Sequence, residues 1–371
     1  MIHRFYVNNY RCLDNFELPI EGLSSALLLG KNGAGKSTVG RALQVLQQIG
    51  RGVNRVGKLV GERDVSFGRT DVPVRFELSV KLGEWHFEYT LALELPPHFR
   101  EMRVLEESLT ISGDVKFSRQ VAELRFPRNG SGQEATMPVD WHLVGLPLVQ
   151  ARSDRDPVHV FQQWLGRMVI LQPVPAMISG DSGDESLFPE RDLSNLGDWW
   201  SGILNHSPAA YAKIDKALRQ VMPDLLDIKN PLVAKESRSL IVQFGDASRP
   251  QPIPFELLSD GEKCLVAWAM VMAANEAYGP LFCFWDEIDC HLALSEIGDF
   301  TGDLRRAFER GGQFVATSHN VEAIHRFSDN NTFVLHRRSH LEPTQVRPLS
   351  SFEYTDLAGA LARGELTTEV P

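Results

Sequence analysis

Apolar and polar positions divide the chain into segments of two different periods. Near the N-terminus, the apolar run SALLL at residues 25–29 ends at a glycine-rich turn. The following GRALQVLQQI has the spacing of apolar residues that is typical of a helix. The pattern predicts a buried strand, a tight turn and a helix. Residues 1–20 alternate enough to predict two edge strands of a sheet.

Between Val72 and Phe126 the period changes to two. The segments VPVRFELSV, EWHFEYTLALEL, RVLEESLTIS and AELRF are separated by turn residues, which predicts an inserted antiparallel β-subdomain over residues 72–127. The pattern then becomes helical. NLGDWWSGIL and PAAYAKIDKALRQVMPDLL are the best amphipathic segments, so we expect a helical subdomain over residues 175–235.

The remaining chain alternates strands with helices. SRSLIVQFG predicts a strand, an apolar helix follows residue 259, and the strands LFCFWDE and QFVATSHN flank the helical segment ALSEIGDFTGDLRRAFERG. This alternation of strands and helices favours a mainly parallel sheet and an α/β fold. We expect a nucleotide-binding lobe at 1–71, a second lobe at 236–345 and a C-terminal tail at 346–371. We find no internal repeat and no heptad array.

The composition is that of an ordinary globular protein. Of 371 residues, 43% are hydrophobic and 23% are charged. The apolar runs are too short to cross a bilayer and no signal peptide is evident, so we expect a cytoplasmic protein without membrane contact. The four cysteines have no metal-ligand spacing, and we expect them to be reduced and mostly buried.

The net charge of -10 argues against a generally basic surface for nucleic acid. The most basic segment lies just after the first helix, and two acidic residues, Glu62 and Asp64, dilute it. A solvated loop is the simpler interpretation, and a nucleic-acid contact is the alternative. Its cations are Arg51, Arg55, Lys58, Arg63 and Arg69.

The glycine-rich turn has a specific chemistry. GKNGAGKS fits G-x-x-x-x-G-K-[ST] with a strand before it and a helix after it, the context in which backbone N–H groups wrap a phosphate. Lys36 is expected to hold the β- and γ-phosphates, and Ser37 to ligate Mg²⁺. A structural glycine turn is the alternative. The predicted ATP-binding residues are Gly30, Lys31, Asn32, Gly33, Ala34, Gly35, Lys36, Ser37 and Thr38.

Three further segments place polar residues after short apolar strands, where ligands bind in open α/β sheets. After LFCFW, Asp286 is expected to reach Mg²⁺ and Glu287 to act as the general base. After QFVAT, His319 is a candidate to contact the γ-phosphate. After MVIL, Gln172 can bind Mg²⁺ or the attacking water through its amide. For each of these residues the alternative is an ordinary strand-end or loop position without a functional role.

The stretch LLSDGEK introduces a helix far from the glycine loop. Ser259 and Gly261 lie where backbone N–H groups and the helix dipole favour an anion. One nucleotide site already has its own loop, so this helix start would serve the nucleotide of a second copy of the chain. The alternative is an ordinary N-cap formed by Ser259 or Asp260.

The order of these segments resembles the ABC-type ATPase head, and more narrowly the AAA-like ATPases of the OLD, RecF and SMC group. The resemblance runs from NYRCL near the N-terminus, through RDLSNLGDWW, to NTFVLH. It implies a two-lobed P-loop NTPase head that closes as a head-to-tail dimer on ATP and Mg²⁺. It also implies that Ser259, Gly261 and Asp289 face the nucleotide across the dimer.

The sequence departs from this family at Asp260, which replaces a glycine, and at Ile288, Ala293 and Leu294, which replace Pro, His and Pro. No acidic run typical of the OLD nuclease follows the histidine. Small ATPases of this kind resemble components of bacterial anti-phage or toxin systems with a separate effector, a nuclease or toxin. The alternatives are a RecF-like clamp on DNA, a scaffold that holds ATP with little turnover, and a transporter subunit.

Overall fold

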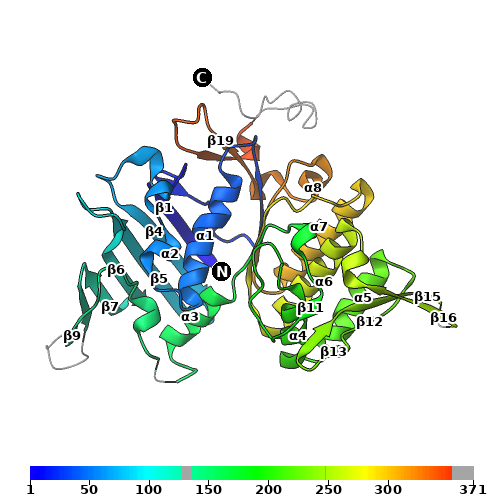
Figure 1. Ribbon diagram of the computed structural model, residues 1–371. Coiled ribbons are helices and arrows are strands. Elements are labelled where there is room, and N and C mark those ends of the chain that lie inside the picture. Colours follow the sequence, from blue (N-terminus) through cyan, green and yellow to red (C-terminus); the bar gives the residue numbers. More distant parts are fainter. Residues whose placement is uncertain (128–134, 152, 247, 353–371) are drawn as a thin grey trace. The chain divides into compact units, whose positions relative to one another are not determined.

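The computed structural model describes residues 1–127, 135–151, 153–246 and 248–352. Its contacts divide the chain into two compact units (Figure 1). Unit 1 comprises Met1–Leu23, Leu28–Met168 and Asp329–Pro371, and unit 2 comprises Ser24–Leu27 and Val169–Ser328. The predicted C-terminal tail, 346–371, lies outside the described residues from 353 onward. Its residues 346–348 belong to strand β20 (Gln345–Pro348).

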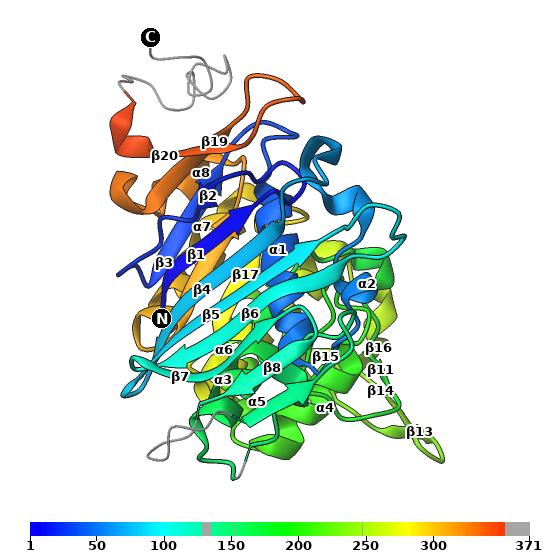
Figure 2. The same cartoon turned by 90° about the vertical axis from the view of Figure 1, so that its left-hand side faces the viewer.

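Unit 1 is built on an eight-stranded antiparallel sheet, which faces the reader in Figure 2. The sheet order is β2-β1-β4-β5-β6-β7-β8-β9, so β1 is an interior strand rather than the edge strand that the sequence predicts. The strands are β1 (Ile2–Asn8), β2 (Phe16–Glu17), β4 (Val74–Leu82), β5 (Trp85–Glu94), β6 (Arg103–Ile111), β7 (Asp114–Gln120), β8 (Glu123–Phe126) and β9 (Ala135–Pro138).

Two helices lie on one face of this sheet, α1 (Lys36–Gly50) and α3 (Pro157–Gly166), and they pack against each other. The Phe161 ring of α3 stacks on Phe87 of β5 at 5.1 Å, which joins the helix to the apolar face of the strand. In β4 every second residue is buried, the alternation from which the sequence predicts a strand covered on one side. Unit 1 also contains α2 (Val56–Leu59), β19 (Thr332–His336) and β20 (Gln345–Pro348).

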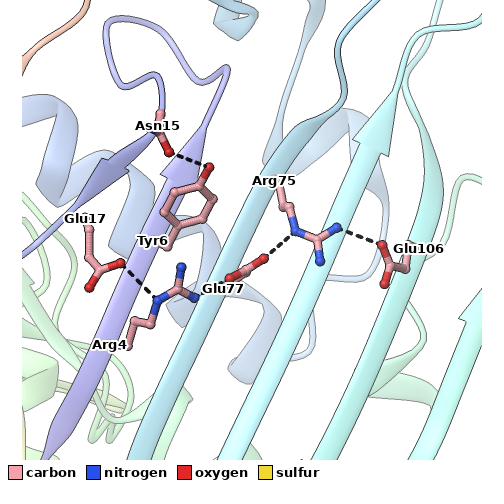
Figure 3. A network of polar contacts seen from close by, with 7 residues as sticks. All are labelled: Arg4, Tyr6, Asn15, Glu17, Arg75, Glu77 and Glu106. Atoms are coloured by element: carbon pink, nitrogen blue, oxygen red, sulfur yellow. Dashed lines mark hydrogen bonds and ion pairs between the residues drawn. The ribbon is translucent and has the colours of Figure 1, made fainter.

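The other face of the sheet carries a chain of alternating charges (Figure 3). Arg4 of β1 bonds to Glu17 and to Glu77, and Arg75 bonds to Glu77 at 2.5 Å and to Glu106 at 2.7 Å. Arg75 and Glu106 meet across β5 because the residue between them is the small Ala92, which pairs with both positions.

Unit 2 is centred on three parallel strands, β10 (Val169–Leu171), β17 (Phe282–Trp285) and β18 (Gln313–Thr317), in that order. All three are fully buried, as expected for parallel strands. Strand β3 (Ser25–Leu29) runs from unit 2 into unit 1. The helices are α4 (Leu196–His206), α5 (Ala210–Val221), α6 (Asp260–Tyr278), α7 (Leu294–Glu309) and α8 (Val321–His325).

Two small antiparallel sheets complete unit 2, with strand orders β11-β14-β13 and β12-β15-β16. Helix α6 has buried residues on every side, and its Trp268 stacks on Phe300 of α7 at 5.6 Å. Parallel strands, an antiparallel sheet and a group of helices are the predicted elements of the fold class. The strands are β11 (Asp181–Ser182), β12 (Leu225–Lys229), β13 (Leu232–Ala234), β14 (Ser237–Ser239), β15 (Ile241–Asp246) and β16 (Arg249–Pro254).

Candidate functional site

The glycine loop of unit 1 has the backbone that its sequence predicts. Gly33 and Gly35 have φ of 81° and 105°, values that favour glycine, and Gly35 caps α1. A Cβ at Gly30 would lie 2.3 Å from the Leu335 carbonyl oxygen, and one at Gly35 would lie 2.5 Å from Thr344 Oγ1. The loop therefore depends on glycine for conformation and for space.

Lys36, the predicted phosphate ligand, is buried and turns back on this loop. Its Nζ donates a hydrogen bond to the Gly30 carbonyl at 2.7 Å. Ser37 is half-buried in the first turn of α1, and the Thr38 hydroxyl accepts a bond from Cys12 Sγ at 3.5 Å. An ammonium group enclosed by the loop is suited to a phosphate that enters it.

Two residues that the sequence analysis missed brace the outer side of the loop. Thr344 Oγ1 donates to the Ala34 carbonyl at 2.9 Å, and Arg337 Nη1 donates to the Gly33 carbonyl at 3.2 Å. Both belong to the connection between β19 and β20, far from the loop in sequence. A cavity of about 410 Å³ lies between the glycine loop and residues 335–340. Its lining includes the exposed Lys31 and Asn32.

In unit 2, four predicted residues follow three neighbouring parallel strands. Gln172 follows β10, Asp286 and Glu287 follow β17, and His319 lies two residues beyond β18. The strands pair in register, with Leu171 beside Trp285 and Trp285 beside Ala316. All four residues therefore lie at the carboxyl edge of the same sheet, the position where open α/β sheets bind ligands.

The two acidic residues after β17 lie in different environments. Asp286 is 1% exposed, whereas Glu287 is half-buried and has a φ of 56°, in the left-handed region. Thr317 joins them, since its hydroxyl donates to Asp286 Oδ1 at 2.8 Å and accepts the Glu287 N–H at 2.7 Å. The sequence analysis missed Thr317, although it ends the strand next to β17.

The environment of Asp286 fits a metal ion. Its Oδ2 atom is buried and has no hydrogen-bond partner within the described part of the chain. A buried oxygen of this kind is an unusual cost unless a ligand uses it. Carboxylate, amide and hydroxyl oxygens are the donors that Mg²⁺ prefers. Within unit 2, Asp286 and Gln172 therefore have the right chemistry for Mg²⁺, and a bound Mg²⁺ would neutralise charge on a phosphate group. The predicted contribution of Ser37, which belongs to unit 1, stays a prediction.

The residues after the acidic pair form a tight turn. The Cys290 thiol donates to Glu287 Oε2 at 3.5 Å, and partial burial, then the charge of Glu287, raise the pKa of Cys290 to about 12. The thiol therefore stays protonated and donates to the candidate base. Asp289 is half-buried, and its Oδ1 atom has no hydrogen-bond partner among the residues that the structure describes.

Ser259 and Gly261 have local roles at the start of α6. Ser259 caps the helix in a capping box, with its Oγ accepting the Glu262 N–H at 3.3 Å. A Cβ at Gly261 would lie 2.7 Å from the His291 carbonyl oxygen, so the glycine lets α6 approach the turn after the acidic pair. The alternative of an ordinary cap is thus realised within the chain. Contacts of Ser259, Gly261 and Asp289 with a second copy stay predictions.

His319 is exposed and lines a hollow with Asn320 and Arg326. Asn320 caps α8, where its side chain accepts the Glu322 N–H at 2.8 Å. A contact of His319 with a γ-phosphate stays a prediction, because the glycine loop belongs to unit 1 and the histidine to unit 2.

Two of the five cations in the basic segment after α1 are paired with acidic residues. Arg55 pairs with Glu101 at 2.6 Å, and Arg69 pairs with Asp14 at 2.8 Å. These pairs favour the interpretation as a solvated loop. All four cysteines are free, and three of them are buried. None of the helices in the described ranges is long and apolar enough to span a bilayer.

The comparisons with known proteins agree with this geometry. Residues 1–72 match the AAA ATPase domain family. The chain aligns over 94% of its length with the crystal structure of an Smc head bound to the C-terminal winged-helix domain of ScpA, with a TM-score of 0.56 and 15% identity, and covers 99% of that head. The fold is that of an SMC-type ATPase head. The predicted fold class and the predicted ABC- and SMC-like type are both confirmed.

Two further proteins that resemble this chain are also SMC proteins. The SMC head domain from Thermotoga maritima gives a TM-score of 0.46 at 14% identity, over 94% of this chain and 98% of that domain. The chromosome partition protein Smc of Chlorobaculum tepidum is 34% identical over 74 residues, which is 20% of this chain. The chain spans only 6% of that protein's length.

Proposed function

We propose that this chain binds ATP with Mg²⁺ and hydrolyses it. The observation that carries the proposal is the pair of carboxylates after β17. Asp286 is buried with an unsatisfied oxygen, whereas Glu287 is accessible and fixed in a left-handed conformation. A fixed carboxylate that can bind a metal, beside an accessible one that can activate water, is an arrangement suited to hydrolysis of a phosphoanhydride.

The proposed roles follow from the chemistry of each group. The glycine loop and Lys36 bind the phosphates, Glu287 orients and activates the attacking water, and His319 contacts the γ-phosphate. The protonated Cys290 thiol donates to Glu287, and this contact restricts the motion of the candidate base. An ATP-holding scaffold without turnover would have no use for a carboxylate in the position of Glu287.

Glu287→Gln tests this assignment. The amide cannot accept a proton, so we expect ATP binding to persist while turnover falls by about 10²–10⁴-fold, the usual contribution of a general base. Turnover is measured by phosphate release, and binding by the fluorescence of a labelled nucleotide. Glu309→Gln, at an exposed position in α7, is the matched control. Turnover at the wild-type rate in Glu287→Gln would show that Glu287 is not the base.

We also propose that ATP closes a head-to-tail homodimer in which Ser259, Gly261 and Asp289 of one copy face the nucleotide of the other. The proposal is supported by the exposed position of Ser259 at the start of α6, where N–H groups favour an anion. In Glu287→Gln, size-exclusion chromatography with ATP and Mg²⁺ should show this dimer.

Ser259→Arg separates binding from turnover. We expect nucleotide binding by the single chain to persist while hydrolysis is lost, because the arginine blocks the surface that meets the second copy. Ser259→Ala is the control, since it removes the same helix cap, at a cost of about 1 kcal/mol, without adding bulk. Equal loss of binding and turnover in Ser259→Arg would mean that this segment acts within its own chain.

The biological role that we propose is regulation of a separate effector, a nuclease or toxin of a bacterial anti-phage or toxin system. The proposal is supported by a structural relative, the Smc head that was crystallised with a domain of another protein, ScpA. The alternative is a RecF-like clamp on DNA. DNA affinity that falls steeply with salt would favour the clamp.

A further inference from the structure

The most deeply buried carboxylate at the candidate site has a cationic neighbour in the segment RDLSNLGDWW, a residue to which the sequence analysis assigns no chemical role. Arg191 Nη2 lies 3.6 Å from Asp286 Oδ2, with 14% of the arginine side chain and 0% of the aspartate side chain exposed. Thr317 occupies the other oxygen, Oδ1. The guanidinium therefore lies beside the one oxygen that the fit to a metal ion depends on.

Arg191 is held in place through its backbone. Its carbonyl oxygen accepts the Gln172 N–H at 2.7 Å, and the carbonyl of Asp192 accepts the Val174 N–H at 3.2 Å. The segment that carries the arginine thus runs along the residues that follow β10. Arg191 is tied directly to Gln172, the other unit 2 residue that is predicted to bind Mg²⁺.

The separation of 3.6 Å has a chemical meaning. It is too long for a hydrogen bond between nitrogen and oxygen, but short enough for strong Coulomb attraction in a buried position. A buried carboxylate without a compensating charge is strongly unfavourable. Arg191 supplies that charge and leaves the Oδ2 lone pairs unused.

We propose that Arg191 is a resident counter-ion of Asp286 that competes with Mg²⁺ for this carboxylate. It neutralises Asp286 while the metal is absent, and its guanidinium is repelled when the metal arrives. Arg191 thereby sets the concentration of Mg²⁺ that the chain requires. It is a positioning residue, and its role rests on the proposed function, in which Asp286 binds the metal of Mg²⁺–nucleotide.

The test is a titration of the full-length chain with Mn²⁺, followed by electron paramagnetic resonance in the presence of ADP. Removal of the competing charge in Arg191→Gln should lower the Mn²⁺ concentration at half-saturation about tenfold or more, the order expected for unit charges about 4 Å apart. Arg191→Lys retains the charge and should stay near wild type. Arg219→Gln removes an arginine that pairs with Asp215 at an exposed position, and should leave the Mn²⁺ concentration at half-saturation unchanged.

Thermal unfolding without metal gives a second readout. Arg191→Gln should unfold at a lower temperature than wild type, and Mn²⁺ with ADP should raise its unfolding temperature by more than that of wild type. An unchanged or higher half-saturation concentration in a folded Arg191→Gln would overturn the role of Arg191 alone. No Mn²⁺ binding by the wild-type chain with ADP would overturn the metal site, and with it the proposed function.

Discussion

Each unit contains an arginine and a carboxylate buried side by side, and the two pairs are satisfied to very different extents. In unit 1, Arg119 Nη1 lies 3.8 Å from Glu107 Oε2, with both side chains 0% exposed. In unit 2, Arg191 lies 3.6 Å from Asp286. Similar separation and similar burial therefore do not distinguish them; their hydrogen bonds do.

The unit 1 pair is part of a complete network. Glu107 accepts three hydrogen bonds, from the Tyr89 hydroxyl and from the N–H groups of Gly145 and Leu146, at 2.6–2.9 Å. Arg119 donates to three backbone carbonyls, those of Val121, Asp140 and Leu143. The pair thus fixes residues 140–146 to the sheet, and the network is closed to any further ligand.

The unit 2 pair is incomplete by comparison. Asp286 receives one side-chain hydrogen bond, from Thr317, and its second oxygen has none from the described residues. A network that satisfies every group stabilises the fold, whereas an oxygen left unused at a strand end is available to bind. The difference separates a charge pair with a structural role from one that is available for the function that we propose.

The largest effect that this comparison predicts is in the closed network. Glu107→Ala leaves Arg119 buried without its partner and removes the acceptor for two backbone N–H groups. We expect the free energy of unfolding to fall by about 3–5 kcal/mol, as for other broken buried pairs. Chemical denaturation of the full-length chain measures it.

Glu106→Ala is the matched control, because Glu106 neighbours Glu107 on β6 but pairs with Arg75 on the partly exposed face. We expect Glu106→Ala to lower the free energy of unfolding by less than about 1 kcal/mol. An equally small loss in Glu107→Ala would mean that the closed network does not stabilise unit 1, and the contrast between the two pairs would disappear.

A smaller effect is expected from Thr317, which holds the aspartate of the incomplete pair. Thr317→Val removes the buried donor to Asp286 Oδ1 and the partly buried acceptor for the Glu287 N–H, at a cost of about 1–3 kcal/mol in stability. Because both carboxylates lose their support, ATP turnover should fall by a larger factor than nucleotide affinity. Thr317→Ser keeps the hydroxyl and should retain both. Wild-type turnover in Thr317→Val would remove Thr317 from the site.

The sequence predicted those parts of the site whose chemistry is local. The glycine loop, the acidic pair and the helix start at Ser259 are each read within a few residues. Thr317 and Arg191 were missed because they reach Asp286 through strand pairing and through a segment bonded to Gln172, neither of which leaves a local signal. The sequence placed Gly261 at a helix start, but its close approach to His291 depends on the packing of α6 and left no local signal.

The same holds for the fold. Period two predicted the strands of the antiparallel sheet, but not that β1 lies inside the sheet between β2 and β4. The closed network of Glu107 and Arg119 also had no signal, because two charged residues in alternating strands read as solvent-facing positions. Burial of both followed only from the course of residues 140–146 over the sheet.

The smallest effect is expected where the same kinds of side chain meet on the solvent face of the sheet (Figure 3). Arg75 and Glu77 are 31% and 21% exposed, so Arg75→Ala should cost about 0.2–1 kcal/mol, less in high salt. Chemical denaturation at two salt concentrations measures it. A cost near that of Glu107→Ala would show that charge pairing, rather than completeness of burial, determines the energy.

The pH dependence sharpens this contrast further. Burial alone would raise the pKa of Glu77, but hydrogen bonds from Arg4 and Arg75 outweigh it and hold the pKa below its usual value. A lowered folded-state pKa means that Glu77 contributes stability above the unfolded pKa of about 4.3, and that this contribution is lost as the pH falls through the folded pKa. Glu77→Gln should flatten this acid limb of the stability curve.

At Glu107 the effect of burial dominates and raises the pKa of the carboxyl. The contribution of Glu107 to the free energy of unfolding is therefore lost as the pH rises through its folded-state pKa.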